Sequence, residues 1–259
     1  MAKYNTTLET ATLHISKGNS KIGKGIYAFS TLPGNETHPI TVNGEVMTDI
    51  AGTCSHHCDS CFNSGCYAVK SAKLHHNAVI PAWSDNTLLL RSGRLFDLLK
   101  AYINVKQKSK SPIEIFRINV SGEIIDEKDL AMWNELAILH PEIKFGVYTK
   151  NFRAVDKFMK KHKNTADNFC INISEWHGVA KKLLEKYPNQ FNVFEYDDSN
   201  LKNNTLTDSE KLRLASITHC PAVTNKGKHA VDKNGVAITC DRCLRCYNKT
   251  GKRTAVYAH

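Results

Sequence analysis

Residues 113–152 read IEIFRINVSGEIIDEKDLAMWNELAILHPEIKFGVYTKNF and contain two strand-like runs separated by an amphipathic helical pattern. The runs at 113–120 and 144–149 are rich in β-branched and aromatic side chains, and Asp126 is a candidate helix N-cap between them. The alternation extends to strands at 25–32, 169–174 and 191–196 and helices at 152–162 and 177–187. Parallel strands need such crossovers, so we expect an α/β fold: a partial, open βα barrel of mostly parallel strands.

The flanking segments complete this expectation. Asn43-Gly44 predicts a hairpin turn within residues 40–46, and Asp85 or Asn86 is a plausible cap for a helix that continues towards residue 99. Thr207 and Glu210 form a capping-box pattern for a short helix. After residue 218 the periodicity stops, so the chain divides into a barrel at 1–217 and a small cysteine-rich module at 218–259.

Ligands of parallel α/β folds bind at the carboxyl ends of the strands. That rule selects three segments: Ser121-Gly122-Glu123, Thr149-Lys150-Asn151 and Ser174-Glu175-Trp176. For Arg117 and Lys150 two interpretations stay open, namely side chains that face the barrel mouth and ordinary surface salt bridges.

Eight of the nine cysteines fall into two groups. The first group lies in the loop 54–66 and the second in the tail; their members are Cys54, Cys58, Cys61 and Cys66, then Cys220, Cys240, Cys243 and Cys246. Such spacings let several thiolates converge on one metal centre, and thiolates select zinc, Cu(I) or iron–sulfur clusters. Cys170 stands within a strand-like run, where a buried core residue is expected.

Zinc and iron–sulfur ligation differ in their typical spacing. Zinc sites pair two short Cys-x2-Cys knuckles, whereas the tail has a Cys-x2-Cys-x2-Cys run like that of bacterial ferredoxins. A remote fourth ligand is available at Cys220, which precedes Pro221. We therefore favour a [4Fe–4S] cluster in the tail over zinc.

The spacing Cys54-x3-Cys58-x2-Cys61, before a βα pattern, resembles that of the radical S-adenosylmethionine superfamily. In that superfamily three cysteines hold three irons of a [4Fe–4S] cluster, and the fourth iron binds S-adenosylmethionine. The resemblance implies a second cluster here. It also implies that Ser121, Gly122 and Glu123 correspond to the Gly-Gly-Glu segment that contacts the methionine amino group.

Over nearly the whole chain the sequence is similar to the phage gene-product-eighty-eight family. The shared features are the run KGNSK at 17–21, Cys66-Tyr67-Ala68, FRINVSGE at 116–123, Tyr148-Thr149-Lys150 and the terminal cysteine run. This similarity implies a phage or prophage origin and supplies no reaction.

Two departures from the superfamily pattern leave alternatives open. Ser60 precedes the third cysteine, where the superfamily usually has an aromatic residue that contacts adenine. The fourth cysteine, Cys66, belongs to the Cys-Tyr-Ala triplet that carries the last ligand in related phage proteins, so Cys54, Cys61 and Cys66 are an alternative ligand trio. If all four cysteines bound one cluster, no iron would remain open to S-adenosylmethionine.

The composition of the chain indicates which classes of partner to expect. The chain has 35 Lys and Arg against 25 Asp and Glu, a net charge of +10, which favours association with nucleic acid or another polyanion. There is no apolar run of eighteen residues and no signal-peptide core, so we expect a protein of the bacterial host cytoplasm that does not enter a membrane.

Three functions follow from these patterns. The first is a radical S-adenosylmethionine enzyme with an auxiliary [4Fe–4S] cluster, supplied with electrons by a reductant protein. The second is a non-catalytic iron–sulfur protein that binds nucleic acid or a host protein, and the third is a zinc-stabilised regulator. The sequence offers no Ser-His-Asp or paired-carboxylate pattern that would indicate hydrolysis.

Overall fold

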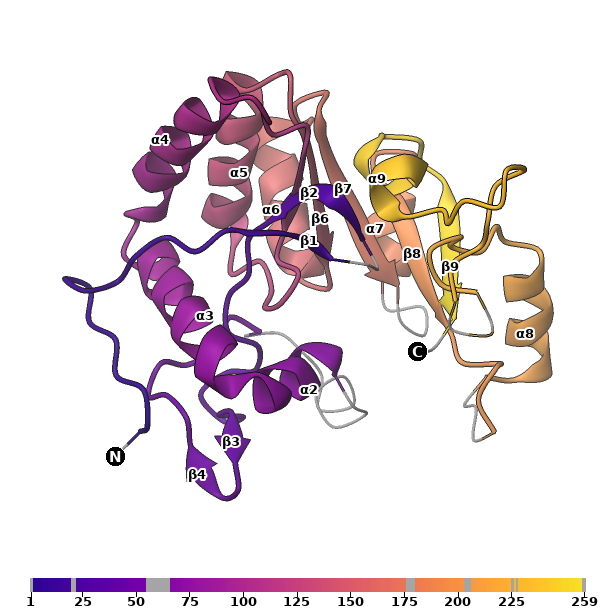
Figure 1. The fold of residues 1–259 in the computed structure, drawn as a ribbon. Coiled ribbons are helices and arrows are strands. Elements are labelled where there is room, and N and C mark those ends of the chain that lie inside the picture. Colours follow the sequence, from indigo (N-terminus) through magenta and orange to yellow (C-terminus); the bar gives the residue numbers. More distant parts are fainter. Residues whose placement is uncertain are drawn as a thin grey trace.

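A seven-stranded sheet organises the part of the chain that the computed structural model describes, namely residues 2–19, 22–54, 66–175, 180–202, 206–224, 226 and 228–257 (Figure 1). Its strands are β1 (Ser16–Asn19), β2 (Gly23–Ala28), β5 (Ile115–Ile118), β6 (Lys144–Thr149), β7 (Phe169–Glu175), β8 (Asn192–Asp197) and β9 (Arg253–Tyr257). A separate hairpin consists of β3 (Thr41–Val42) and β4 (Glu45–Val46). The helices are α2 (Tyr67–Leu74), α3 (His76–Arg91), α4 (Leu95–Gln107), α5 (Glu127–Leu139), α6 (Phe152–His162), α7 (Lys181–Lys186), α8 (Asp208–Ala215), α9 (Cys240–Cys243) and the 3₁₀ turn η1 (Arg245–Tyr247).

The strand order across the sheet follows the order along the chain. It runs β1-β2-β5-β6-β7-β8-β9; β1 pairs antiparallel with β2, and every other neighbouring pair is parallel. Helical segments connect the parallel strands, as the sequence predicted. The mixed α/β fold with a mostly parallel sheet is therefore confirmed, while closure of that sheet into a partial barrel stays a prediction.

The main core lies between one face of the sheet and helices α4, α5 and α6 (Figure 1). Trp133 of α5 is fully buried there, with its ring centroid 5.4 Å from that of Phe29 and 5.9 Å from that of Phe116. Phe116 in turn lies 5.7 Å from Phe145 of the next strand. Because side chains alternate along a strand, the neighbours of these core residues point to the opposite face.

Two predicted helix caps and one predicted turn are confirmed by the structure. Asp126 caps α5 by accepting from the N–H groups of Lys128 and Asp129. Asn151, which was not predicted as a cap, caps α6. Thr207 forms the predicted capping box with Glu210 at α8. The hairpin turn has positive φ angles at Asn43 and Gly44, which such tight turns require.

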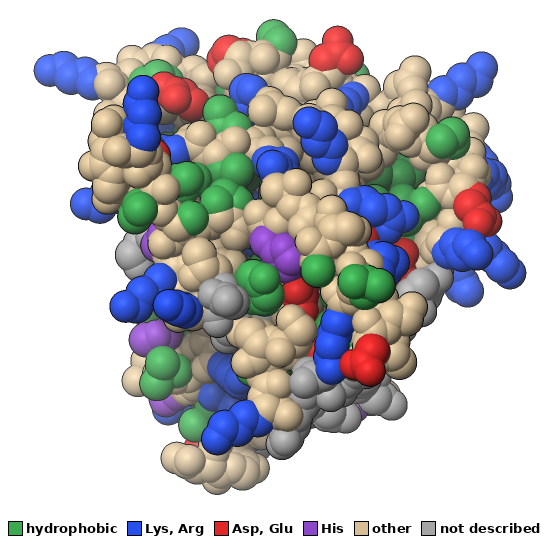
Figure 2. All heavy atoms as spheres, turned by 90° about the vertical axis from the view of Figure 1, so that its right-hand side faces the viewer, with side chains coloured by type: hydrophobic (Ala, Val, Ile, Leu, Met, Phe, Trp, Pro, Cys, Tyr) green, Lys and Arg blue, Asp and Glu red, His purple; other side chains and the backbone are tan. Residues whose placement is uncertain are grey.

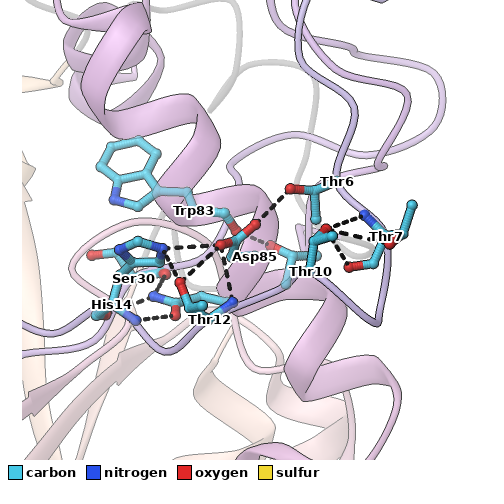
Figure 3. A network of polar contacts seen from close by, with 10 residues as sticks. Thr6, Thr7, Thr10, Thr12, His14, Ser30, Trp83 and Asp85 are labelled. Carbon is cyan, nitrogen blue, oxygen red and sulfur yellow. Dashed lines mark hydrogen bonds and ion pairs between the residues drawn. The ribbon is translucent and has the colours of Figure 1, made fainter.

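The helix predicted to begin at Asp85 or Asn86 was placed wrongly. Helix α3 begins nine residues earlier, at His76, and runs through Pro81 to Arg91. Asp85 is instead a buried anchor for the N-terminal segment, because it accepts hydrogen bonds from Thr6 and Thr12 and pairs with His14 (Figure 3). A buried carboxylate in mid-helix needs such partners, and they come from a distant segment that periodicity does not reveal.

The C-terminal tail contributes to the main sheet. Strand β9 pairs in parallel with β8 from Val193–Arg253 to Asp197–Tyr257. The separate cysteine-rich module predicted for residues 218–259 is therefore not confirmed, since part of that segment completes the fold predicted for residues 1–217. Of the helix predicted at 177–187, the described part is α7, which begins at Lys181.

Candidate functional site

The sheet face opposite the main core, which we call the inner face, receives the cysteine-rich tail. Ile26 and Ile115 lie on this face and form a small apolar cluster with Tyr247. Gly146 permits this packing, because a Cβ atom there would lie 2.6 Å from the Tyr247 ring. Figure 1 shows α9 on the other side of the sheet from α4, α5 and α6.

The tail cysteines are held by short turns and by the edge of the sheet. Cys240 and Cys243 begin and end α9, and Leu244 follows with a left-handed φ of 56°, which turns the chain so that Cys246 falls in η1. Cys220 is fixed from the other side, because its N–H donates to the carbonyl of Ala255 in β9 at 2.7 Å. This hydrogen bond holds Cys220 against strand β9, and its role as the fourth ligand of a tail cluster stays a prediction.

The tail thiols lie within electrostatic range of one another. Burial raises the pKa of Cys240 to about 11, and the neighbouring thiols of Cys220 and Cys243 add to the shift. Burial likewise raises the pKa of Cys246 to about 12, with Cys220 and Cys240 contributing. Thiols with pKa values as high as those of Cys240 and Cys246 are neutral without a bound cation, so a metal centre that binds these two as thiolates must displace their protons.

Basic and N–H groups around these thiols favour their ionised form. The charge of Arg117 opposes the pKa rise at Cys240, and that of Arg245 opposes the rise at Cys220. Burial raises the pKa of Cys220, while the backbone N–H groups of Ala222 and Val223 lower it by hydrogen bonding. Such hydrogen bonds and nearby positive charge suit a cluster ligated by thiolates, which carries net negative charge.

Two asparagines attach the tail to the inner face. Asn172 Nδ2 donates to the carbonyl of Cys246 at 2.9 Å. Asn192 Nδ2 donates to the carbonyls of Arg245 and Asn248, at 3.1 and 3.0 Å. Cys170, which was expected in the core, is buried beneath them. The register of β7 and β8 places Asn172 opposite Asn192, so one polar ladder holds the segment that carries Cys246.

The first cysteine group begins beside the carboxyl end of β5. The N–H groups of Thr53 and Cys54 donate to the carbonyls of Leu32 and Gly34, which fixes Cys54 after the extension of β2. Cys66 immediately precedes α2. Cys58 and Cys61 lie outside the described residues, as do Ser60 and the rest of 55–65, and so does Trp176.

The segment Ser121-Gly122-Glu123 contacts the residue before Cys54 directly. The N–H of Glu123 donates to Thr53 Oγ1 at 2.8 Å, and Thr53 Oγ1 lies 2.9 Å from Thr31 Oγ1. Gly122 has a φ of 83°, and a Cβ atom there would lie 1.9 Å from Thr31 Oγ1. The structure therefore joins two parts of the predicted site, although they are separated by about seventy positions in the sequence.

Glu123 and Ser121 differ in how their side chains are used. The Glu123 carboxylate accepts from the N–H groups of Ile124 and Lys150, both at 2.8 Å, and burial raises its pKa. The Ser121 hydroxyl is buried and has no hydrogen-bond partner within the described part of the chain. A bound S-adenosylmethionine could take hydrogen bonds from Ser121, whereas Glu123 already links the ends of β5 and β6.

Arg117 of β5 lies on the inner face. Its guanidinium carbon is 4.8 Å from the centre of the Tyr148 ring, and its Nε is buried without a hydrogen-bond partner among the described residues. It acts electrostatically on Tyr67, which follows Cys66, and on Cys240 and Cys246. Arg117 stacks on Tyr148 and forms no surface salt bridge among the described residues, while its position at a barrel mouth stays a prediction. The alternation of IFRI in β5 was the sequence signal for a position on the inner face.

Among the described residues, no group of three or more His, Cys, Asp or Glu side chains is arranged to hold a metal ion. Cluster binding therefore stays a prediction that rests on the chemistry of the thiols.

No described helix combines the length and the apolar character that crossing a bilayer requires.

The fold and site define a mixed α/β protein in which one sheet face carries four tail cysteines and one strand end adjoins a second cysteine group. A family model described as Gene product 88 matches residues 3–249. The chain belongs to this family, which confirms the phage gene-product resemblance of the motifs. The comparisons with curated proteins and with solved structures give no match.

Proposed function

We propose that this protein is an iron–sulfur protein with two [4Fe–4S] clusters that acts as a radical S-adenosylmethionine-type enzyme. The observation that carries the proposal is the electrostatic influence of Cys220, a distant residue, on the thiols of Cys240 and Cys246, together with that of Cys243 on Cys220. Thiolates are the preferred ligands of such clusters. The first cysteine group adjoins the strand ends of the same sheet.

The N-terminal group is proposed to leave one iron open. A cluster of this kind, when bound, supplies the electron that cleaves S-adenosylmethionine. The chain's own contribution is to hold the segment Ser121-Gly122-Glu123 against Thr53. Gly122 allows the close approach of Thr31 and Thr53, and the Ser121 hydroxyl, which no other described residue engages in a hydrogen bond, would be available to a polar ligand.

A non-catalytic protein on the same fold is the second candidate, and one observation favours it. Cys54 and Cys66 both lie within electrostatic range of the Tyr67 hydroxyl, so the fourth cysteine of the group is not remote from the first. Four cysteine ligands would close the cluster and exclude S-adenosylmethionine. The protein would then bind a nucleic acid or a host protein through its basic surface.

Anaerobic purification followed by iron, sulfide and zinc analysis is the first test. We expect about eight irons and eight sulfides per chain, as two cubane clusters require. Cys243→Ser should remove about half of the iron, whereas Cys170→Ser, the matched control outside both groups, should remove none. Two zinc ions per chain in place of iron would contradict both iron–sulfur candidates.

Electron paramagnetic resonance then separates the enzyme from the binding protein. The dithionite-reduced protein should change its cluster signal when S-adenosylmethionine is added, and it should release 5′-deoxyadenosine. Cys54→Ala should abolish both effects, and Cys66→Ala should leave the cluster in place. An unchanged signal together with cluster loss in Cys66→Ala would mean a closed site and would favour the non-catalytic candidate.

A further inference from the structure

Positive charge is concentrated on two neighbouring helices of the outer layer. Helix α6 with its C-cap and helix α7 comprise residues 152–163 and 181–186, and these carry eight Lys or Arg against two acidic side chains. That excess of six is more than half of the net charge of +10. All eight basic residues are exposed and form what we call the α6–α7 surface: Arg153, Lys157, Lys160, Lys161, Lys163, Lys181, Lys182 and Lys186.

The periodicity of α6 places its basic residues in a row. Arg153, Lys157 and Lys161 follow one another at intervals of four residues, so they share the solvent-facing side of the helix, while its buried residues face the main core. From Arg153 to Lys161 the helix rises about 12 Å. The row therefore runs along most of the helix.

An ion-pair cluster joins α7 to this row. Asp156 of α6 lies 2.8 Å from the Lys160 ammonium and 2.5 Å from that of Lys186 in α7, and the Tyr187 hydroxyl donates to it at 3.0 Å. Hydrogen bonds from Lys160 and Lys186 lower the pKa of Asp156 to about 2. The cluster holds the charged sides of the two helices next to each other.

Four cations of the α6–α7 surface have no carboxylate partner among the described residues. Lys157 pairs with Glu127, and Lys181 pairs with Glu185. With Lys160 and Lys186 bound to Asp156, the cations that take part in no ion pair with a described residue are Arg153, Lys161, Lys163 and Lys182.

Helix stability does not explain all of these charges. Cations in the last turn of a helix interact favourably with its dipole, which accounts for Lys161 and Lys163 at the end of α6. Arg153 and Lys182 are the second residues of α6 and α7, where the positive end of the dipole disfavours a cation. A cation retained at such a position suits a ligand that carries negative charge.

The absence of apolar groups restricts the class of ligand. No large apolar side chain of α6 or α7 is exposed, although both helices lie wholly within the described residues. A helix that binds a membrane surface presents apolar side chains beside its cations. Single-stranded nucleic acid needs aromatic rings for stacking, and the exposed ring of α6, His162, already stacks on Phe158 at 4.6 Å. A duplex backbone requires only fixed positive charges.

We propose that the α6–α7 surface binds the phosphate backbone of a double-stranded nucleic acid without reading its sequence. The surface lies on the outer layer, whose apolar residues form the main core, and the cysteine-rich tail lies on the inner face (Figure 1). The inference therefore goes beyond the proposed function and does not depend on the clusters.

Fluorescence anisotropy of a labelled DNA duplex of mixed sequence, titrated with the full anaerobically purified chain, tests the proposal. The logarithm of the affinity should fall with the logarithm of the salt concentration with a slope of about −3 to −4, as for about four neutralised phosphates. Replacing the four unpaired cations by Gln should abolish most of this slope. It should also weaken binding about tenfold or more in about 50 mM salt.

A control variant removes the same number of charges elsewhere. It replaces four exposed lysines outside the surface by Gln and should keep most of the affinity and slope: Lys108, Lys110, Lys228 and Lys233. A second variant keeps the charge at the four unpaired positions, with Arg153→Lys and the three lysines changed to Arg. It should bind like the unmodified chain, and it tests the proposal even if the Gln variant does not fold.

Several results would overturn the proposal. They are no complex with the duplex at low salt, an equal loss of affinity in the control variant, and tighter binding to a single strand of the same sequence. Binding to vesicles that contain phosphatidylserine, without binding to the duplex, would identify a membrane surface as the partner instead. The Gln variant should keep the iron content and the S-adenosylmethionine response of the unmodified chain, so failure of the two-cluster proposal is distinguishable from failure of this one.

Discussion

Gly122 illustrates how a single residue links the two halves of the candidate site. Its φ of 83° is unfavourable for other residues, and a Cβ atom there would lie 1.9 Å from Thr31 Oγ1 and 2.6 Å from Thr53 Oγ1. We expect Gly122→Ala to lower the free energy of unfolding by about 2–4 kcal/mol, because overpacking adds to backbone strain. Urea unfolding measures this loss. The control is Gly235→Ala, at a position with a φ of 75° and open space around it, which should lower the free energy of unfolding by about 1 kcal/mol. Equal losses in the two variants would show that the contact of a Cβ atom at position 122 with Thr31 and Thr53 does not matter.

Asp85 gives a prediction with a definite pH dependence. Burial alone would raise its pKa, but hydrogen bonds from Thr6, Thr12 and His14 outweigh burial and lower the pKa below the ordinary value (Figure 3). A carboxyl whose pKa is lowered on folding stabilises the protein above its unfolded pKa, and this contribution disappears as the pH falls through the folded pKa.

Asp85→Asn should therefore lower the free energy of unfolding by about 1–3 kcal/mol at neutral pH, which is the usual contribution of hydrogen bonds to a charged group. The difference from the unmodified protein should shrink as the pH falls below about 4. Urea unfolding at several pH values measures it, with the exposed Glu45→Gln as control. A difference that does not change between neutral and acid pH would show that the charge of Asp85 contributes nothing.

Among the elements, β7 and β8 determine where the tail lies. Asn192 donates to two tail carbonyls and accepts from the N–H and hydroxyl of Thr250, both at 3.1 Å. We expect Asn192→Asp to destabilise the protein by about 2–4 kcal/mol, since two buried carbonyls lose their donor and face a carboxylate. Hydrogen exchange should be faster at residues 253–257. Asn234→Asp, in an exposed turn of the tail, should change neither quantity; slow exchange in Asn192→Asp would mean that strand pairing alone holds β9.

The elements also show what the sequence could reveal. Strands β6 and β7 and helix α6 were predicted to within about a residue, because apolar alternation and the caps are local signals. Strand β9 was missed, since its five residues carry mixed side chains and depend on β8 for pairing. The contact of Thr53 with Glu123 and the approach of Cys220 to Cys240 are tertiary, and no local pattern encodes them.

For the whole molecule, charge is the property that bears on partners. Figure 2 shows Lys and Arg side chains scattered over one face without a single dominant patch, in keeping with the net charge of +10. We expect any nucleic-acid binding to fall steeply with salt; neutralising four phosphates costs about a hundredfold in affinity between about 50 and about 200 mM salt. A gel-shift titration at these two concentrations measures the effect. Affinity that is independent of salt would contradict binding through phosphate contacts, and no complex at low salt would remove nucleic acid as a partner.

The contact between the tail and the N-terminal segment has a consequence for how the chain folds. Asp241, in the tail, accepts a hydrogen bond from the N–H of Gly25, 216 positions earlier, and its own N–H donates to Ile22. Contacts of such sequence separation form late and slow the folding reaction. During translation the apolar patch of Ile26 and Ile115 stays exposed to water until Tyr247 has left the ribosome. A nascent chain is therefore exposed to aggregation until that moment, and the inner face cannot reach its final form before the tail has been synthesised.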